Sequence, residues 1–302
     1  DFEALNVPIK GPRCDPSTSN TQKIANQVPC SFCFVIVRCD GASTKPIIYR
    51  GENAVSELYK QINDAVTSLN ETFKNPATMV MTELDKQKHY SADKCWICEL
   101  PFGLNKWDKP DRVRDHCHIT GAYRGPAHYA CNLQLRIKPD KIKIPVVFHN
   151  LRSYDGHLLM SAIGTASSEK INAIPNNMEK YLTFSLGQLQ FIDSLQFMNC
   201  SLEKLTASLN NDDFKITRKL YDKIDLLTRK GVYPYQYMDS FERFSEEQLP
   251  PIEAFYSDLS REQISVKDYH HAQNVWKEFN CKTLGDYHDL YLKTDVTLLA
   301  DV

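Results

Sequence analysis

Four residues at ligand spacing are the first sign of chemistry in this sequence. Cys95 and Cys98 are separated by two residues, and His128 and Cys131 repeat that spacing further along the chain. Two residues between ligands let a tight turn present both side chains to one tetrahedral ion, and two such turns leave no position open for water. The pattern predicts a structural zinc site, and the alternative is a set of ordinary buried cysteines with a surface histidine.

The residues between the two zinc pairs are not needed to bind zinc, and their types indicate a second chemistry. Asp115 and His116 are adjacent, and Asn132 directly follows the last expected zinc ligand. An imidazole can take a proton from water at neutral pH, whereas carboxylate and amide oxygens suit Mg²⁺. Together these residues have the composition of a site that cuts phosphodiesters.

The order of these motifs resembles a known family of nucleases. A Cys-x2-Cys pair, the segment RDHCHITGAYRG and a ligand pair ending in Cys-Asn are similar to the recombination endonuclease VII branch of the His-Me finger (HNH) nucleases, over roughly residues 93–137. The resemblance implies that His116 is the general base. It also implies that Asp115 and Asn132 hold the metal that stabilises the leaving 3′ oxygen.

Two positions differ from that family. His128 stands where cysteine is usual, a change that zinc tolerates, and Cys117 stands where aspartate is common. Cys117 could in principle be a fifth ligand. We expect it instead to be a strand residue that faces away from its neighbours His116 and His118, because side chains alternate across a strand.

Length and composition place these motifs in a large folded chain. The 302 residues are 42% hydrophobic and 25% charged, which is ordinary for a globular protein with one large core and a smaller inserted unit. No segment has the apolar length of a membrane span and the first residues carry no signal-peptide pattern, so we expect an intracellular protein with no membrane partner. Ten cysteines are too few for a disulfide scaffold of this length.

The net charge of −2 argues against bulk attraction to nucleic acid, but charge is unevenly distributed. Residues 95–146 contain nine basic side chains against five acidic ones, and this local excess suits a phosphate-facing unit. The alternative is an ordinary solvated surface. The basic residues are Lys106, Lys109, Arg112, Arg114, Arg124, Arg136, Lys138, Lys141 and Lys143.

Outside the zinc segment, strand and helix patterns alternate without repeats. Apolar runs predict strands at 30–38, 45–50 and 144–150 and a hairpin at 184–197, and helical periodicity predicts helices at 51–73 and 287–302. Cys30 and Cys33 also have Cys-x2-Cys spacing, but they lie in an apolar strand and are expected to be structural. The fold class expected is α/β with one inserted finger.

Three polar clusters rich in carboxylates are far apart in this framework. They comprise Asp1 and Glu3; Asn150, Tyr154 and Asp155; and Tyr291 and Asp295. In the first cluster, residues i and i+2 share one face of a strand. The second cluster follows a buried strand, where α/β sheets place their sites. In the third cluster, residues i and i+4 share one face of a helix. Each cluster alone is more often a turn or a cap, but four carboxylates together can hold two divalent ions.

In this order, Asp-x-Glu, Asn-x3-Tyr-Asp and Tyr-x3-Asp are similar to the three exonuclease motifs of family B DNA polymerases. The segment SLEKL at 201–205 is similar to the motif that contacts single-stranded DNA in protein-primed polymerases. Lys230, in RKGVY, resembles their catalytic lysine. With the zinc segment between the first two motifs, nearly the whole chain resembles the N-terminal part of the polymerases of Maverick/Polinton-type transposable elements and related viruses.

That resemblance implies a ribonuclease H-like mixed-sheet exonuclease domain at 1–90 and 141–302, with a small zinc-stabilised ββα-metal domain inserted at 91–140. Two Mg²⁺ or Mn²⁺ ions would stabilise the entering and leaving oxygens of the reaction. The implied roles are metal binding by Asp1, Glu3, Asp155 and Asp295, orientation of the attacking water by Tyr291, and contact with the frayed strand by Asn150, Tyr154, Ser201 and Leu202.

We therefore expect a metal-dependent DNA nuclease, a 3′-5′ proofreading exonuclease with an embedded HNH-type endonuclease. The alternative is a binding module, in which a non-cleaving zinc finger grips DNA beside an inactive exonuclease fragment. A zinc-stabilised interaction domain is the third candidate. The presence of Asp115, His116 and Asn132 together favours cleavage, because binding alone requires none of the three.

The resemblance also implies a wider context in DNA replication. The chain shows no polymerase motifs, so a polymerase domain is expected in cis in a longer protein. A protein primer is a further implied partner, together with single-stranded 3′ ends and branched DNA. The sequence begins on its first expected catalytic residue, so we expect either a fragment or an impaired exonuclease. A mobile element of a eukaryote would place the protein in the nucleus.

Overall fold

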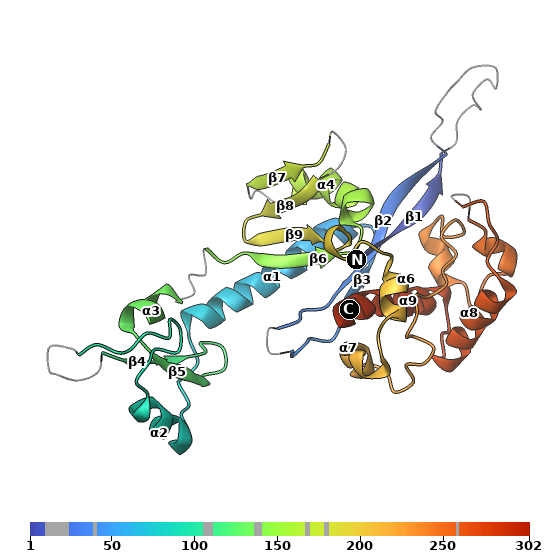
Figure 1. Cartoon of the computed structure of the whole chain (residues 1–302). Helices are drawn as coiled ribbons and strands as arrows, with labels where there is room; N and C mark the ends of the chain where they lie inside the picture. Colours follow the sequence, from blue (N-terminus) through green and yellow to red (C-terminus); the bar gives the residue numbers. More distant parts are fainter. Residues whose placement is uncertain are drawn as a thin grey trace. The chain divides into compact units, whose positions relative to one another are not determined.

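The structure is a computed structural model that describes residues 1–9, 24–38, 41–104, 111–135, 141–166, 170–177, 181–257 and 260–302. It has the mixed α/β character predicted from the sequence, with several small sheets and helices (Figure 1). The chain divides into two compact units. Unit 1 comprises Asp1–Tyr59, Pro145–Leu186 and Gln190–Val302, and unit 2 comprises Lys60–Ile144 and Gly187–Leu189.

The first sheet of unit 1 is an antiparallel set of three strands. Its order is β1 (Phe2–Pro8), β2 (Ala25–Phe34) and β3 (Ile47–Arg50). The register shifts between Glu3, which pairs with Ser31, and Ala4, which pairs with Pro29. Proline lacks an N–H for the ladder but is tolerated at such a bulge. The predicted strand at 30–38 is therefore only partly correct, because β2 starts earlier, at Ala25, and ends earlier, at Phe34.

The second sheet has the order β6-β9-β8-β7. The hairpin predicted at 184–197 is present: β8 and β9 are neighbours, and Gly187 between them has a positive φ of 55° that suits a tight turn. Phe148 of β6 stacks on Phe191 of β9 and on Phe2 of β1, with ring centroids 6.4 Å apart in both pairs. The strands are β6 (Ile144–Phe148), β7 (Ile171–Pro175), β8 (Tyr181–Leu186) and β9 (Leu189–Asp193).

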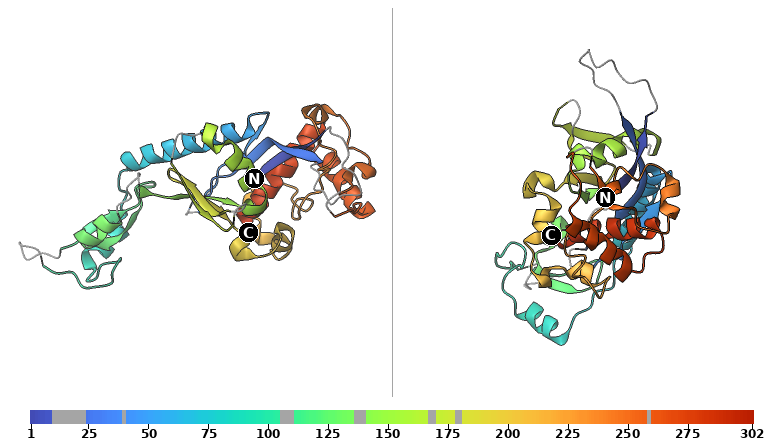
Figure 2. Two further views of the ribbon diagram at one scale, coloured as in Figure 1. Left: turned by 90° about the horizontal axis from the view of Figure 1, so that it is seen from above. Right: turned by 90° about the vertical axis from the view of Figure 1, so that its right-hand side faces the viewer.

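The two predicted long helices are confirmed as α1 (Ala54–Lys74) and α9 (Leu284–Asp301). Thr283 and Asp286 form a capping box at the start of α9, which is buried over much of its length and packs against β2. Figure 2 shows α9 beside α8 (Val266–Glu278) in unit 1, where both helices contribute to one apolar core. The shorter helices of this unit are α4 (Asp155–Ala166), α5 (Leu195–Met198), α6 (Leu202–Ala207) and α7 (Lys215–Arg218).

Unit 2 contains most of α1, then α2 (Glu83–Ser91), the hairpin β4 (Val113–His116) and β5 (Tyr123–Ala127), and α3 (Tyr129–Gln134). The finger expected at 91–140 falls inside this unit, which begins earlier, at Lys60. Cys117 is not in a strand as predicted, because β4 ends at His116 and Cys117 starts the turn of the hairpin, where it accepts a hydrogen bond from Gly121 N. No helix in the described ranges is long and apolar enough to cross a membrane.

Candidate functional site

The three acidic motifs, which are far apart in the sequence, come together in unit 1. Asp1 and Glu3 lie at the start of β1, Asp155 is the first residue of α4, and Asp295 lies in α9. The backbone N–H of Phe2 donates to Asp155 Oδ1 at 3.2 Å, which ties β1 to α4. The side chains of Glu3, Asp155 and Asp295 are all buried, with residue exposures of 6%, 2% and 4%.

The electrostatics of this acidic cluster show that the charges of Asp155 and Asp295 act on Glu3. Burial raises the pKa of Glu3 to about 8, and the charges of Asp295 and Asp155 contribute to the increase, while Lys230 opposes it. Burial also raises the pKa of Asp155 to about 6 and that of Asp295 above its usual range. The predicted Lys230 is therefore close enough to partly neutralise the cluster.

One carboxylate oxygen in the cluster lacks any hydrogen-bond donor. Asp295 Oδ1 is buried without a partner, although unpaired buried oxygens are costly and rare. Such an oxygen fits a divalent cation, because hard cations bind carboxylates. The carboxylate oxygens of the acidic cluster do not yet lie as close together as metal ligands do. Among the described residues, the only group of possible ligand atoms that lie within 4.8 Å of one another is the Cys/His set of unit 2.

Tyr291 lies beside the acidic cluster, as the sequence predicted, and belongs to a group of three tyrosines. Its hydroxyl is 2.6 Å from that of Tyr235, and its ring stacks on that of Tyr233 with centroids 4.8 Å apart. Burial raises the pKa of Tyr291 well above its usual value, so the hydroxyl stays protonated. Gly231 accommodates this ring, because a Cβ there would lie 2.6 Å from Tyr291. Sequence reasoning missed Tyr235, although it lies five residues after Lys230.

A second buried group that the sequence did not reveal lies on the same helix. His288 is fully buried in α9 and bonds Ser31 Oγ at 2.7 Å and Tyr233 Oη at 2.5 Å. Burial lowers the pKa of His288 to about 3, so its ring is neutral and bonds one neighbour as donor and the other as acceptor. Ser31 pairs with Glu3 across the sheet, so this network links α9 to the strand that carries Glu3.

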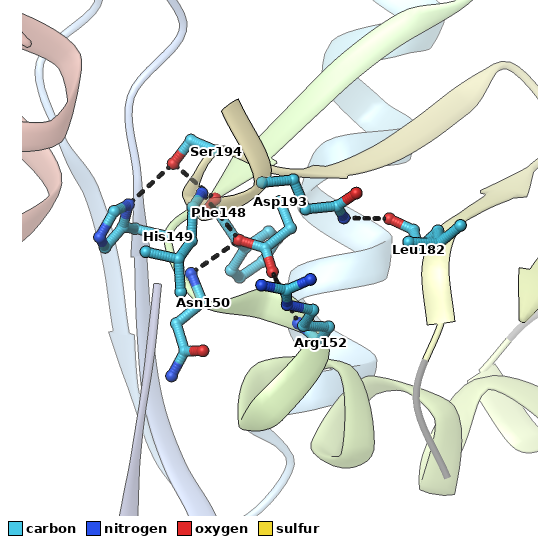
Figure 3. A network of polar contacts seen from close by, with 9 residues as sticks. Phe148, His149, Asn150, Arg152, Leu182, Asp193 and Ser194 are labelled. Atoms are coloured by element: carbon cyan, nitrogen blue, oxygen red, sulfur yellow. Dashed lines mark hydrogen bonds and ion pairs between the residues drawn. The ribbon is translucent and has the colours of Figure 1, made fainter. Parts of the chain in front are cut away.

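The loop after β6 is organised by Asp193, which is fully buried at the end of β9 (Figure 3). Its carboxylate accepts from Asn150 N at 2.9 Å and from Arg152 N at 3.2 Å. Asn150 has a positive φ of 73°, a conformation that asparagine tolerates, and the chain then enters α4 at Asp155. Asp193 therefore positions the second acidic motif, a role that its place in a predicted hairpin did not indicate.

The remaining predicted DNA contacts are placed as follows. Tyr154 precedes Asp155 and is half-buried, and burial followed by the charges of Glu3 and Asp155 raises its pKa above its usual value. Ser201 caps α6, its Oγ accepting from Lys204 N at 3.4 Å, and Leu202 is buried. Ser201 and Leu202 thus have structural roles in α6 that do not require DNA.

The four predicted zinc ligands meet in unit 2. Cys95, Cys98, His128 and Cys131 place one ligand atom each within 4.8 Å of all the others. His128 Nδ1 lies 3.4 Å from Cys98 Sγ and 3.8 Å from Cys131 Sγ. Ligands bound to one tetrahedral zinc ion are expected about 3.6 Å apart, and these two distances from His128 are close to that value.

Hydrogen bonds from neighbouring groups favour the orientation and the ionisation that metal binding requires in this Cys/His cluster. His128 Nε2 is 3.1 Å from Pro101 O, so the Nε2–H donates to that carbonyl and leaves Nδ1 free to bind the ion. Although burial opposes ionisation, hydrogen bonds from backbone N–H groups of Cys98, His128 and Ile97 lower the pKa of Cys95 to about 6. Cys117 lies outside the cluster, so a fifth ligand is not supported in the described residues.

The strand and helix next to the Cys/His cluster carry the predicted endonuclease residues. Asp115 and His116 are the last residues of β4, and Asn132 lies on α3, which contacts β4. Asp115 is 2% exposed, its Oδ1 accepts from Arg124 Nη2 at 2.8 Å, and its Oδ2 is buried without a partner. One oxygen of Asp115 is therefore occupied by a salt bridge and the other is available.

The two glycines of the segment TGAYRG are required by the local structure of the hairpin. Gly121 has a φ of 76° in the hairpin turn, and a Cβ there would collide with the backbone oxygen of Thr78. Gly125 packs under the Trp96 ring, where a Cβ would lie 2.7 Å from Cγ. These two glycines of the motif therefore have a structural role.

The predicted basic excess can be followed only in part. Arg112, Arg114, Arg124, Lys141 and Lys143 are described, and Lys106, Lys109, Arg136 and Lys138 lie outside the described residues. Arg112 donates to the backbone oxygens of Ala92 and Tyr90 and holds the end of α2.

Comparisons with family models, curated proteins and solved structures gave no match to this chain.

Proposed function

We propose that the chain is a metal-dependent DNA nuclease whose acidic cluster removes nucleotides from 3′ ends. The observation that carries this proposal is the meeting of Glu3, Asp155 and Asp295 from three distant segments, buried together although each is costly to bury. Three buried carboxylates rarely meet for structural reasons alone, whereas a site for divalent cations requires them. A ribonuclease H-like exonuclease fold, as the resemblance implies, is part of the proposal.

In this proposal Asp1, Glu3, Asp155 and Asp295 hold one or two Mg²⁺ or Mn²⁺ ions. When bound, the ions would stabilise the charge on the attacking and leaving oxygens. The protonated Tyr291 hydroxyl, fixed by Tyr235 at 2.6 Å, orients water toward the scissile phosphate. Lys230 adds positive charge beside the cluster, and Asn150 and Tyr154 lie on the loop and helix start that bring Asp155 there.

Digestion of end-labelled single-stranded DNA in Mg²⁺ tests this function. Asp155→Ala removes a shared metal ligand, so release of mononucleotides should fall by several orders of magnitude while single-strand binding is largely kept. Asp225→Ala is the matched control, because Asp225 is an exposed acid of the same unit and should leave the rate unchanged. Mononucleotide release by Asp155→Ala at the parent rate would refute the assignment.

A second activity, internal DNA cleavage by unit 2, is proposed on a separate observation. The hairpin β4-β5 and α3 form a ββα arrangement at the Cys/His cluster, with Asp115 Oδ2 buried and unpartnered at the end of β4. His116 is the proposed general base, and Asp115 and Asn132 the metal-binding pair. The salt bridge from Arg124 leaves one Asp115 oxygen for that metal.

Internally labelled DNA with blocked 3′ ends isolates this second activity from end digestion. His116→Ala removes the proton acceptor but no zinc ligand, and the loss of a general base lowers the rate about 10² to 10⁴-fold. Zinc content should stay at one ion per chain, which checks the fold. Equal cutting by parent and variant, or no cutting of linear and branched substrates by the zinc-loaded parent, would leave unit 2 as a DNA-binding module without cleavage.

A further inference from the structure

A basic hollow on α8 lies outside the acidic cluster and outside the endonuclease residues. Its volume is about 550 Å³, and it is lined by Arg229, Val266, Lys267, His270, His271 and Asn274. Every one of these side chains except Val266 carries a hydrogen-bond donor. A hollow with this lining is suited to an anion with several oxygen atoms.

The charges around the hollow leave it with positive character. Arg229 is balanced by Asp268, with Nη2 and Oδ1 2.8 Å apart, whereas Lys267 is exposed and adds a second cation. Ser265 and Asp268 already form hydrogen bonds at the N terminus of α8, so the attraction for an anion depends on the side chains rather than on free helix N–H groups.

One side chain in the hollow lacks the hydrogen bond that its position requires. His271 Nε2 is buried and has no partner among the described residues. The ring is only partly covered, and it lies beside the guanidinium of Arg229 on the wall shared with a second cavity.

A second, much smaller cavity of about 20 Å³ shares two wall residues with the hollow. Arg229 and His271 line both cavities, and the second is also bounded by Gly231, Tyr291 and Thr294. Arg229 directly precedes Lys230, whose charge acts on Glu3 and Asp295. The hollow is therefore linked to the acidic cluster of unit 1 along the chain, through Arg229 and Lys230.

We propose that the hollow is a phosphate-binding site, occupied by a backbone phosphate of single-stranded DNA or by the phosphate of a released nucleoside monophosphate. Only the source of the phosphate rests on the proposed nuclease function, because binding requires no cleavage. Arg229 and Lys267 supply charged donors, and His270 and Asn274 supply further donors. Contacts of this kind position a strand without reading its sequence.

The test measures binding of a fluorescent oligothymidylate by anisotropy at several salt concentrations without Mg²⁺ or Mn²⁺, so that no cleavage occurs and the zinc stays bound. Each phosphate contact to a single strand contributes about 0.7 to the slope of log K against log salt concentration. Lys267→Ala should reduce that slope by about 0.7 and weaken binding several-fold. Lys277→Ala, which removes an exposed lysine from the other end of the same helix, should change neither.

Thymidine monophosphate, titrated by calorimetry, distinguishes the two sources. Weaker oligonucleotide binding in Lys267→Ala assigns the hollow to the strand, and weaker binding of the mononucleotide alone assigns it to the product. The proposal is overturned if Lys267→Ala and Lys277→Ala behave alike with both probes, or if the parent protein binds neither. Nuclease assays on Asp155→Ala are independent of this result, so failure of the hollow and failure of the proposed function are distinguishable.

Discussion

At the scale of single residues, Glu3 is expected to make the stability of unit 1 depend on pH. Burial raises its pKa from 4.5 to about 8, so between these values the folded state holds a proton that the unfolded chain has lost. The stability that this proton contributes is complete below pH 4.5 and is lost as the pH rises through 8. His288 acts in the opposite sense, but only below its ordinary pKa of 6.5, because burial lowers that pKa to about 3.

The window from pH 6.5 to 8 excludes His288, but Asp295, whose pKa burial also raises, and the buried amino terminus, whose pKa burial lowers, act there too. The contribution of Glu3 is therefore read from the difference between the parent and Glu3→Gln. Urea unfolding of the metal-free protein should show unit 1 losing stability over this window, by at most about 1.4 kcal/mol per pH unit. Glu3→Gln, which cannot ionise, should remove most of that loss. Divalent cations should reduce the loss in the parent, because they bind the ionised carboxylate. A parent protein as stable at pH 8 as at pH 6.5 would contradict the environment assigned to Glu3.

At the scale of elements, the β4-β5 hairpin depends on Gly121. Its φ of 76° and its contact with the Thr78 backbone exclude a side chain. Gly121→Ala should destabilise unit 2 by about 1–3 kcal/mol, the usual cost of a residue held in a disfavoured conformation. Thermal unfolding with zinc release as the readout measures this change.

Gly103→Ala is the matched control, because Gly103 belongs to the same unit and a Cβ there would meet nothing within 4 Å. It should shift the transition little. Equal transitions for the two variants would show that the turn does not constrain the hairpin.

Elements with strong local patterns could be predicted from the sequence, and long-range contacts could not. The periodicity of α1 and α9 and the apolar run of β6 indicated their positions, and the spacing of Cys95, Cys98, His128 and Cys131 indicated a metal cluster before any geometry was known. Asp193, Tyr235 and His288 had no such pattern. Their roles arise from partners that lie far away in the sequence, such as Asn150 and Ser31.

At the scale of the whole molecule, the two units should respond differently to the loss of zinc. The elements around the Cys/His cluster are short, and the buried hydrophobic side chains among the described residues of 91–135 are only Cys95 and Ala127, so the folding of unit 2 depends on the ion. Cys98→Ser should release zinc and expose the amides of residues 91–135 to hydrogen exchange, while unit 1 keeps its protection.

Cys117→Ser provides the control, because Cys117 lies outside the cluster. It should retain one zinc ion per chain and the exchange pattern of the parent. Protection of the finger in metal-free protein, or loss of zinc in Cys117→Ser, would contradict this account of unit 2.

The central claim is that distant acidic residues act as one catalytic centre, and a double-mutant comparison tests it most directly. The rate of mononucleotide release from end-labelled single-stranded DNA is measured for Asp155→Ala, for Asp295→Ala and for the double variant. Residues that hold the same metals act as a unit, so either change should abolish nearly all activity and the second should add little. Parent-like release by either single variant, or losses that multiply in the double variant, would contradict a shared centre.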